Sequence, residues 1–178
     1  MDPAHTSPDR PRNVTVACAL LLVSALACLA QAAVVGTYRP WMTAMMEAQF
    51  DMFGLPSYAR PDMSATVTQS LVQTAVMLVL TAAGWGVIAL FAYRGKSWAR
   101  ILVIVFGMIG VVAGPISIMV SVALATPPAT YFATAVPGWL CIIAGMILLW
   151  REPSKSWYQA MKPVPVTQWR GTPAGPAA

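Results

Sequence analysis

The stretch RGKSWAR (residues 94–100) places three cationic side chains and one tryptophan between two long apolar segments. The segment before it, residues 63–93, contains no charged residue, and neither does the segment after it, residues 101–150. Uncharged apolar runs of 18 or more residues are typical of transmembrane helices. The stretch is therefore interpreted as a short polar turn between membrane spans, and such turns divide the remaining sequence into helices.

Composition supports the same class. The 178 residues are 58% hydrophobic and only 10% charged, whereas a soluble domain is about 25% charged. Backbone groups in hydrocarbon need internal partners, which favours helices. The sequence predicts an all-α integral membrane protein, a four-transmembrane-helix bundle of two helical hairpins. The expected spans are residues 14–36, 68–93, 101–125 and 128–150. Residues 1–13 are expected to be a flexible terminus and 151–178 a proline-rich tail, mostly disordered after 161.

The distribution of lysine and arginine predicts the orientation. Cytoplasmic loops retain these residues. If both termini are cytoplasmic, nine of the eleven lie inside and two, Arg39 and Arg60, lie outside. We expect a multi-pass protein of the cell (plasma) membrane, in which a set of four residues fixes topology and contacts lipid headgroups: Arg94, Lys96, Trp98 and Arg100.

The first apolar run has a second interpretation. Arginines precede it and an Ala-x-Ala pattern ends it at Ala32, as in a secretory signal peptide. Its uncharged stretch is longer than a signal core of about 7–15 residues. A retained helix is favoured, and cleavage before Ala33 stays open.

Polar residues gather toward the outer ends of the expected helices. Amides are unfavourable against lipid, so these side chains are expected to turn inward. Six of them are candidates for a polar, uncharged crevice that opens to the outside: Gln31, Gln69, Gln73, Ser117, Ser121 and Thr134. Interhelical hydrogen bonding is the alternative explanation of the same pattern.

Small residues spaced four apart predict close helix packing. Gly110 and Gly114 form a GxxxG pattern in the third span, and Cys141 and Gly145 have the same spacing in the fourth. Such residues let helix backbones approach within one bundle or across a dimer seam. We favour packing inside one subunit.

The external loop, residues 37–65, contains the segment RPWMTAMMEAQFDMFGLP, residues 39–56. Its mostly apolar face predicts a short amphipathic helix on the membrane surface. The thioethers of Met42, Met45 and Met46 are also potential Cu(I) ligands. Methionine is equally a flexible filler of gaps in a core, which is the explanation we favour.

Two motifs resemble those of a known group. Arg94, Gly95, Trp98, Ala99 and Arg100 match an Arg-Gly-x-x-Trp-Ala-Arg turn, and Pro153, Ser154 and Trp157 match a Pro-Ser-x-x-Trp segment. The last three helices with these motifs are similar to small uncharacterised four-helix membrane proteins of actinobacteria. The resemblance implies the architecture and no activity.

The expected spans contain no Asp, Glu, Lys, Arg or His, the groups that membrane catalysts and ion couplers generally place inside. A non-enzymatic accessory or structural subunit, packing against another cell-envelope protein, is therefore the favoured function. A binder or carrier of an apolar or uncharged small molecule is the alternative. Expected partners are the lipid bilayer and another membrane protein or a second copy; no cofactor, metal or nucleic acid is expected.

Overall fold

A computed structural model describes residues 9–54, 56, 58 and 61–161 of the chain. Every regular element among them is helical. The elements are α1 (Arg12–Val34), the 3₁₀ helix η1 (Val35–Tyr38), α2 (Arg39–Met52), α3 (Met63–Tyr93), α4 (Ser97–Leu124), α5 (Ala129–Trp150) and α6 (Ser154–Ala160). Four helical segments are long and apolar enough to cross a membrane: 12–52, 63–93, 97–124 and 129–150.

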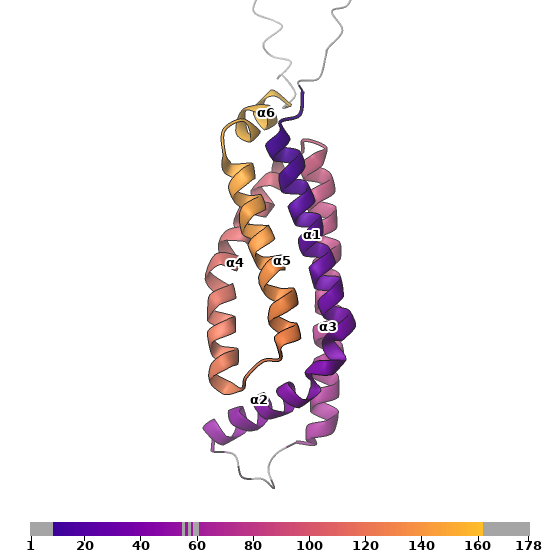
Figure 1. Cartoon of the computed structure of the whole chain (residues 1–178), viewed down its shortest axis with the longest axis vertical. Coiled ribbons are helices and arrows are strands. Elements are labelled where there is room, and N and C mark those ends of the chain that lie inside the picture. The colour runs from indigo at the N-terminus through magenta and orange to yellow at the C-terminus, as the bar shows by residue number, and fades with distance from the viewer. Residues whose placement is uncertain (1–8, 55, 57, 59–60, 162–178) are drawn as a thin grey trace, which may run out of the picture.

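The four long helices stand side by side, as Figure 1 shows. Helix α1 packs closely along both α3 and α5, and α4 completes the bundle against α5 and, less extensively, against α3. The short helix α6 covers one end of the bundle, beside the start of α1, and α2 crosses the opposite end (Figure 1). These two ends are called the α6 end and the α2 end below.

Short turns connect α3 to α4 and α4 to α5. In the first turn Gly95 has a φ of 79°, a left-handed conformation that glycine adopts without strain. In the second, Pro127 and Pro128 follow α4 and cannot continue its hydrogen-bonding pattern. Both turns fall where the sequence predicted them, and they leave α4 and α5 as an antiparallel hairpin (Figure 1).

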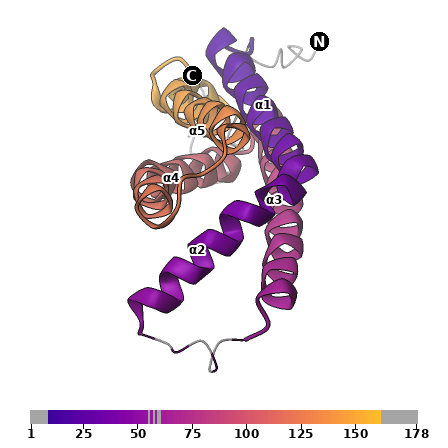
Figure 2. The same cartoon turned by 60° about the horizontal axis from the view of Figure 1, so that its bottom comes forward.

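Two apolar clusters stabilise the structure. The main cluster fills the bundle toward the α6 end and includes Leu21, Ala89, Val103 and Leu149. A second cluster lies at the α2 end. Its buried members come from η1, α2 and α3: Val35, Tyr38, Met42, Val67 and Leu71. Figure 2 shows α2 crossing this end away from α3.

Helix α3 begins at Met63, five residues before the expected start of its span. Asp62 explains the earlier start, because its Oδ1 accepts hydrogen bonds from the backbone N–H groups of Ser64, at 2.9 Å, and Ala65, at 3.4 Å. This is an N-cap. Hydrogen bonds from Ser64 and Ala65 lower the pKa of the Asp62 carboxyl. The remaining helix boundaries lie within a few residues of the expected ones.

The expected amphipathic helix is present as α2, but its apolar face turns toward the protein. Met42 is buried, and Trp41, Met45 and Met46 pack against the second cluster. The indole Nε1 of Trp41 donates to the carbonyl of Ala125 at the end of α4, 3.1 Å away. The expected flexible terminus and disordered tail fall largely on residues 1–8 and 162–178, which lie outside the described residues.

Candidate functional site

The residues expected to form one polar crevice are separated in the structure. Gln31 and Thr134 do meet, at a pocket of about 160 Å³ between α1 and α5 that Ser24, Cys28 and Trp139 also line. Gln69, Gln73 and Ser117 are exposed, and Ser121 is half-buried outside this pocket. The six-residue crevice is therefore not formed.

The reason lies in the direction of each side chain. Val67 and Leu71 are buried beneath η1 and α2, and Gln69 and Gln73 project from the opposite side of α3 at about 100° per residue. The Ser117 hydroxyl donates to the carbonyl of Ala113, 2.8 Å away in its own helix. The polarity of this serine is satisfied locally, without a partner on another helix.

The pocket between α1 and α5 has one unsatisfied polar group. The side chain of Ser24 is 1% exposed, and its hydroxyl has no hydrogen-bond partner within the described chain. The hydroxyl of Thr134 donates to the carbonyl of Thr130 at 3.0 Å. A water molecule occupies about 30 Å³ in the liquid, so the pocket has room for a few waters that would satisfy Ser24. It contains no ionisable carboxylate or amine that could perform acid–base chemistry.

The GxxxG residues of α4 pack against a side chain and not against the backbone of another helix. The indole of Trp139, on α5, lies over them, and its Nε1 donates to the carbonyl of Gly110 at 2.8 Å. A Cβ added to Gly114 would lie 2.6 Å from that nitrogen, whereas one added to Gly110 would lie 4.0 Å from it. Gly114 is therefore the residue that makes room for the indole.

The other expected packing pair lies on α5. A Cβ added to Gly145 would lie 3.4 Å from the carbonyl oxygen of Ala17 and 3.5 Å from Leu21. Gly145 thus brings α5 close to α1, while Cys141 is half-buried. Gly138, two turns along α5, approaches Ala27 in the same way, with 3.1 Å from an added Cβ to the alanine Cβ. The sequence analysis did not include Gly138, although it lies seven residues before Gly145 on the same face.

The four cationic-turn candidates have different surroundings. Arg94 and Lys96 are exposed. Trp98 is half-exposed and packs against Phe91, with 5.0 Å between ring centroids. Arg100 turns toward α5, and its Nε donates to the carbonyl of Leu149 at 3.0 Å. Arg100 therefore satisfies a carbonyl in the last turn of α5, where a helix lacks internal donors.

Helix α6 holds this end of the bundle together, a role that the sequence analysis missed. Tyr158 is 1% exposed, and its hydroxyl donates to the carbonyl of Ala92, near the end of α3, at 2.7 Å. Burial raises the pKa of this phenol. The ring of Trp157 packs on the turn, because a Cβ added to Gly95 would lie 3.1 Å from it. Two adjacent aromatic residues, seven and eight positions after the end of the last span, are the signal that could have indicated this docking.

The methionines of α2 act as packing residues in this structure. Met42 is 9% exposed, and Met45 and Met46 contact the second apolar cluster. Among the described residues, no three His, Cys, Asp or Glu side chains are grouped so that they could hold a metal ion.

The two motifs behind the actinobacterial resemblance meet at the α6 end, where Gly95 packs against the ring of Trp157. Whether the chain belongs with those proteins stays a prediction. Comparisons with protein-family models, with curated proteins and with solved structures found no match to this chain.

Proposed function

We propose that the chain is a multi-pass protein of the cell membrane whose α6 end faces the cytoplasm. Four helices have the required length and hydropathy. The α6 end carries most of the cations of the described chain, and cytoplasmic ends retain lysine and arginine. These are Arg10, Arg12, Arg94, Lys96, Arg100, Arg151 and Lys155. Reporter fusions after Arg100 should give a cytoplasmic signal and fusions near Asp51 an external one; an external signal at Arg100 would reverse the proposed orientation.

Within that membrane, we propose a non-enzymatic accessory or structural subunit that packs against another membrane protein or a second copy of itself. The observation that supports this role is a notch in the exposed face of α3. A Cβ added to Gly84, or to Gly86, meets nothing within 4 Å, whereas Gly107, Gly114, Gly138 and Gly145 are all filled by neighbouring helices of the same chain. Of the two open glycines, Gly86 lies in a groove beside α1 and Gly84 lies on the exposed face of α3.

Helix association in lipid depends on close packing at small residues rather than on hydrophobic burial. Gly84 lies in an apolar groove of about 170 Å³ beside Trp85 and Phe106. Helix α4, on the other side of the groove, turns large apolar side chains such as Phe106 and Ile109 outward. A helix of a partner would fit into this notch more closely than onto a surface of branched side chains.

The carrier alternative has lost its main support. It predicted an outward-facing cavity that reaches past Gln73, whereas Gln73 is exposed and the pocket that contains Gln31 and Thr134 does not include it. The volume of that pocket, about 160 Å³, is below the roughly 300–1,000 Å³ of typical small-molecule sites. The spans also contain none of the ionisable groups with which transporters usually couple ions.

Filling the notch tests the accessory role. Gly84→Leu should leave the thermal stability of the purified chain nearly unchanged, since a Cβ added at Gly84 meets no atom of the chain within 4 Å and the groove of about 170 Å³ has room for the rest of the side chain. It should also remove the photo-crosslinks formed in native membranes by a probe placed at Thr81, one turn away. Gly86→Leu is the matched control, because Gly86 points to the other side of α3, toward α1.

Two differently tagged copies of the chain, expressed together, separate self-association from binding to another protein. Crosslinks from Thr81 that reach only lipid, or that persist unchanged in Gly84→Leu, would contradict the proposal.

A further inference from the structure

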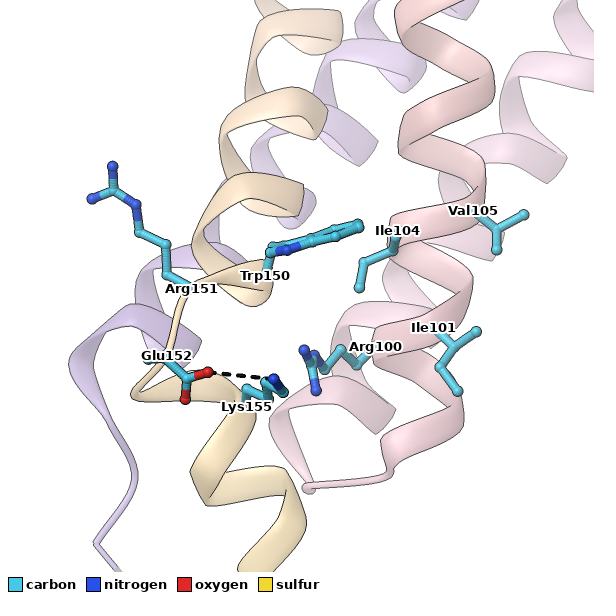
Figure 3. A pocket seen from close by; sticks show the side chains of 8 residues that line it. All are labelled: Arg100, Ile101, Ile104, Val105, Trp150, Arg151, Glu152 and Lys155. Atoms are coloured by element: carbon cyan, nitrogen blue, oxygen red, sulfur yellow. Dashed lines mark ion pairs between the residues drawn. The ribbon is translucent and has the colours of Figure 1, made fainter.

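A groove of about 550 Å³ lies at the α6 end between α4, α5 and the start of α6. Its lining has two parts, which Figure 3 shows from close by. Three branched side chains of α4, Ile101, Ile104 and Val105, form one wall. Arg100 and Lys155 lie at the end of the groove that is farthest from the bundle centre (Figure 3). The apolar and cationic parts are therefore stacked along the helix axis.

The apolar wall is open to its surroundings. Ile101 is 59% exposed, and the indole of Trp150, which lies across the groove from α4, is 60% exposed. In the proposed membrane placement these side chains lie at the level where hydrocarbon meets headgroups. Tryptophan is enriched at this level because its ring is apolar and its N–H is polar.

The cationic part of the groove is partly fixed in place. The Nε of Arg100 donates to the carbonyl of Leu149, which holds the guanidinium, and its terminal nitrogens lie beside Lys155 (Figure 3). Arg100 also lies in the first turn of α4, where the helix dipole already favours an anion. A cation at this end of a helix gains no stabilisation from the dipole. An anion beside Arg100 would be stabilised both by the helix dipole and by the charge of the guanidinium.

One carboxylate shares the groove. Glu152 pairs with Lys155 at 3.4 Å, and both side chains are at least half exposed. Arg151 also lines the groove, but Figure 3 shows its guanidinium directed away from the other cations. Three cations against one carboxylate leave the groove with a positive balance. The Lys155–Glu152 pair is a weak surface contact that a stronger anion could replace.

We propose that this groove binds an anionic phospholipid of the leaflet at the α6 end. The lipid phosphate would lie between the terminal nitrogens of Arg100 and the ammonium of Lys155, and one acyl chain would follow Ile104 and Val105 along α4. Arginine binds phosphate through paired N–H donors, and basic pockets between membrane helices suit anionic headgroups. Glu152 holds Lys155 when the lipid is absent. The proposal uses the membrane placement given above and is independent of any protein partner.

Lipid competition on the full chain tests the proposal. The protein, purified in a neutral detergent, is titrated with phosphatidylglycerol and phosphatidylcholine of identical acyl chains, and bound lipids are counted by native mass spectrometry. We expect retention of phosphatidylglycerol in preference to phosphatidylcholine. Lys155→Gln should weaken its binding by about 5-fold, the effect of one surface cation. Arg100→Gln/Lys155→Gln should weaken binding further.

Matched variants distinguish lipid binding in the groove from general attraction of the lipid to the cations at the α6 end. Arg94→Gln/Lys96→Gln removes two cations from the same end of the molecule but not from the groove, and should change phosphatidylglycerol binding by less than about 2-fold. Glu152→Gln frees Lys155 and should strengthen binding several-fold. Asp9→Asn makes the same charge change outside the groove and should not.

Three results would overturn the proposal. The first is equal retention of both lipids, which would mean contact with acyl chains alone. The second is an equal loss of binding in the groove variant and the Arg94/Lys96 variant. The third concerns millimolar inorganic phosphate. If phosphate displaces phosphatidylglycerol, and if phosphate alone binds the wild-type chain but not Lys155→Gln, the groove is a site for a free ion. Arg100→Gln removes the contact with Leu149 and could unfold the end of α5, so Lys155→Gln decides the test if that variant is unstable.

Discussion

Adding one methyl group at either glycine of the GxxxG pair should give opposite results. A Cβ at Gly114 would lie 2.6 Å from Nε1 and 2.9 Å from Cε2 of Trp139, whereas one at Gly110 would lie 4.0 Å from the same indole. Non-bonded carbon atoms are most favourable at about 3.5–4.0 Å. Gly114→Ala must therefore displace the indole by about 1 Å, while Gly110→Ala makes an ordinary contact.

The magnitude follows from what that displacement disrupts. The hydrogen bond from Trp139 Nε1 to the Gly110 carbonyl, 2.8 Å long, would exceed hydrogen-bonding distance, and such bonds between membrane helices contribute about 0.6–1.7 kcal/mol. Overpacking a well-filled core adds about 1–3 kcal/mol. Alanine regains about 1 kcal/mol of helix propensity at Gly110 and less at Gly114, because Pro115 follows it and disfavours the helical conformation of a residue that has a Cβ. We expect Gly114→Ala to cost about 2–3 kcal/mol more than Gly110→Ala, which should be neutral or slightly stabilising.

The free energy of unfolding of the full chain in mixed micelles, measured by denaturant titration, checks this difference. Trp139→Leu provides the second half of a double-mutant cycle, because removing the indole should make Gly114→Ala nearly neutral. Trp139→Phe, which loses the donor and also part of the ring that packs over the glycines, should cost at least about 1 kcal/mol. Equal costs at Gly110 and Gly114, or an undiminished cost of Gly114→Ala in the Trp139→Leu background, would refute the reasoning and favour a helix seam at both glycines.

Three further predictions concern the ends of α3. Tyr158→Phe removes the hydrogen bond to the Ala92 carbonyl and should lower the free energy of unfolding by about 1 kcal/mol. Gly95→Ala places a side chain at a φ of 79° and should cost at least about 1–2 kcal/mol in the same titration. Hydrogen bonds from Ser64 depress the pKa of Asp62, so this cap is complete above the ordinary carboxyl pKa and is lost as pH falls through the lower folded value. The protection factors of the amides in the first turn of α3, taken relative to intrinsic exchange at each pH, should therefore fall in acid, and Asp62→Asn should remove that dependence.

The sequence predicted the long helices because their cause is local. Each span is a continuous uncharged run, and each turn has its own signal: Gly95 in a cationic segment, and Pro127 with Pro128. Whether a helix forms over such a run does not depend on which helix packs beside it. The same holds for α2, which a mostly apolar helical face predicted, although its position against α4, through Trp41 and Ala125, could not be deduced.

Pairing between distant residues was not predictable from spacing alone. The pattern at Gly110 and Gly114 indicated a close approach, but a glycine pair accepts an indole as readily as a backbone. Arg100 was interpreted as a topology signal, and its contact with Leu149 depends on where α5 ends in space. Trp157 and Tyr158 were assigned to a tail because α6 is too short to show a helical period.

The failed crevice is explained by the length of α3. Its 31 residues extend about 46 Å at 1.5 Å per residue, which exceeds the roughly 30 Å of hydrocarbon. About 20 residues counted from Tyr93 reach Thr74, so Gln69 and Gln73 belong to the part of α3 at or beyond the membrane boundary. There η1 and α2 cover one side of the helix, at Val67 and Leu71, and the amides occupy the uncovered side. In the proposed membrane placement that side faces water or headgroups, so the glutamines need no partner between helices. The polar stripe is thus a consequence of a helix that continues past the bilayer, and it indicates where the span ends.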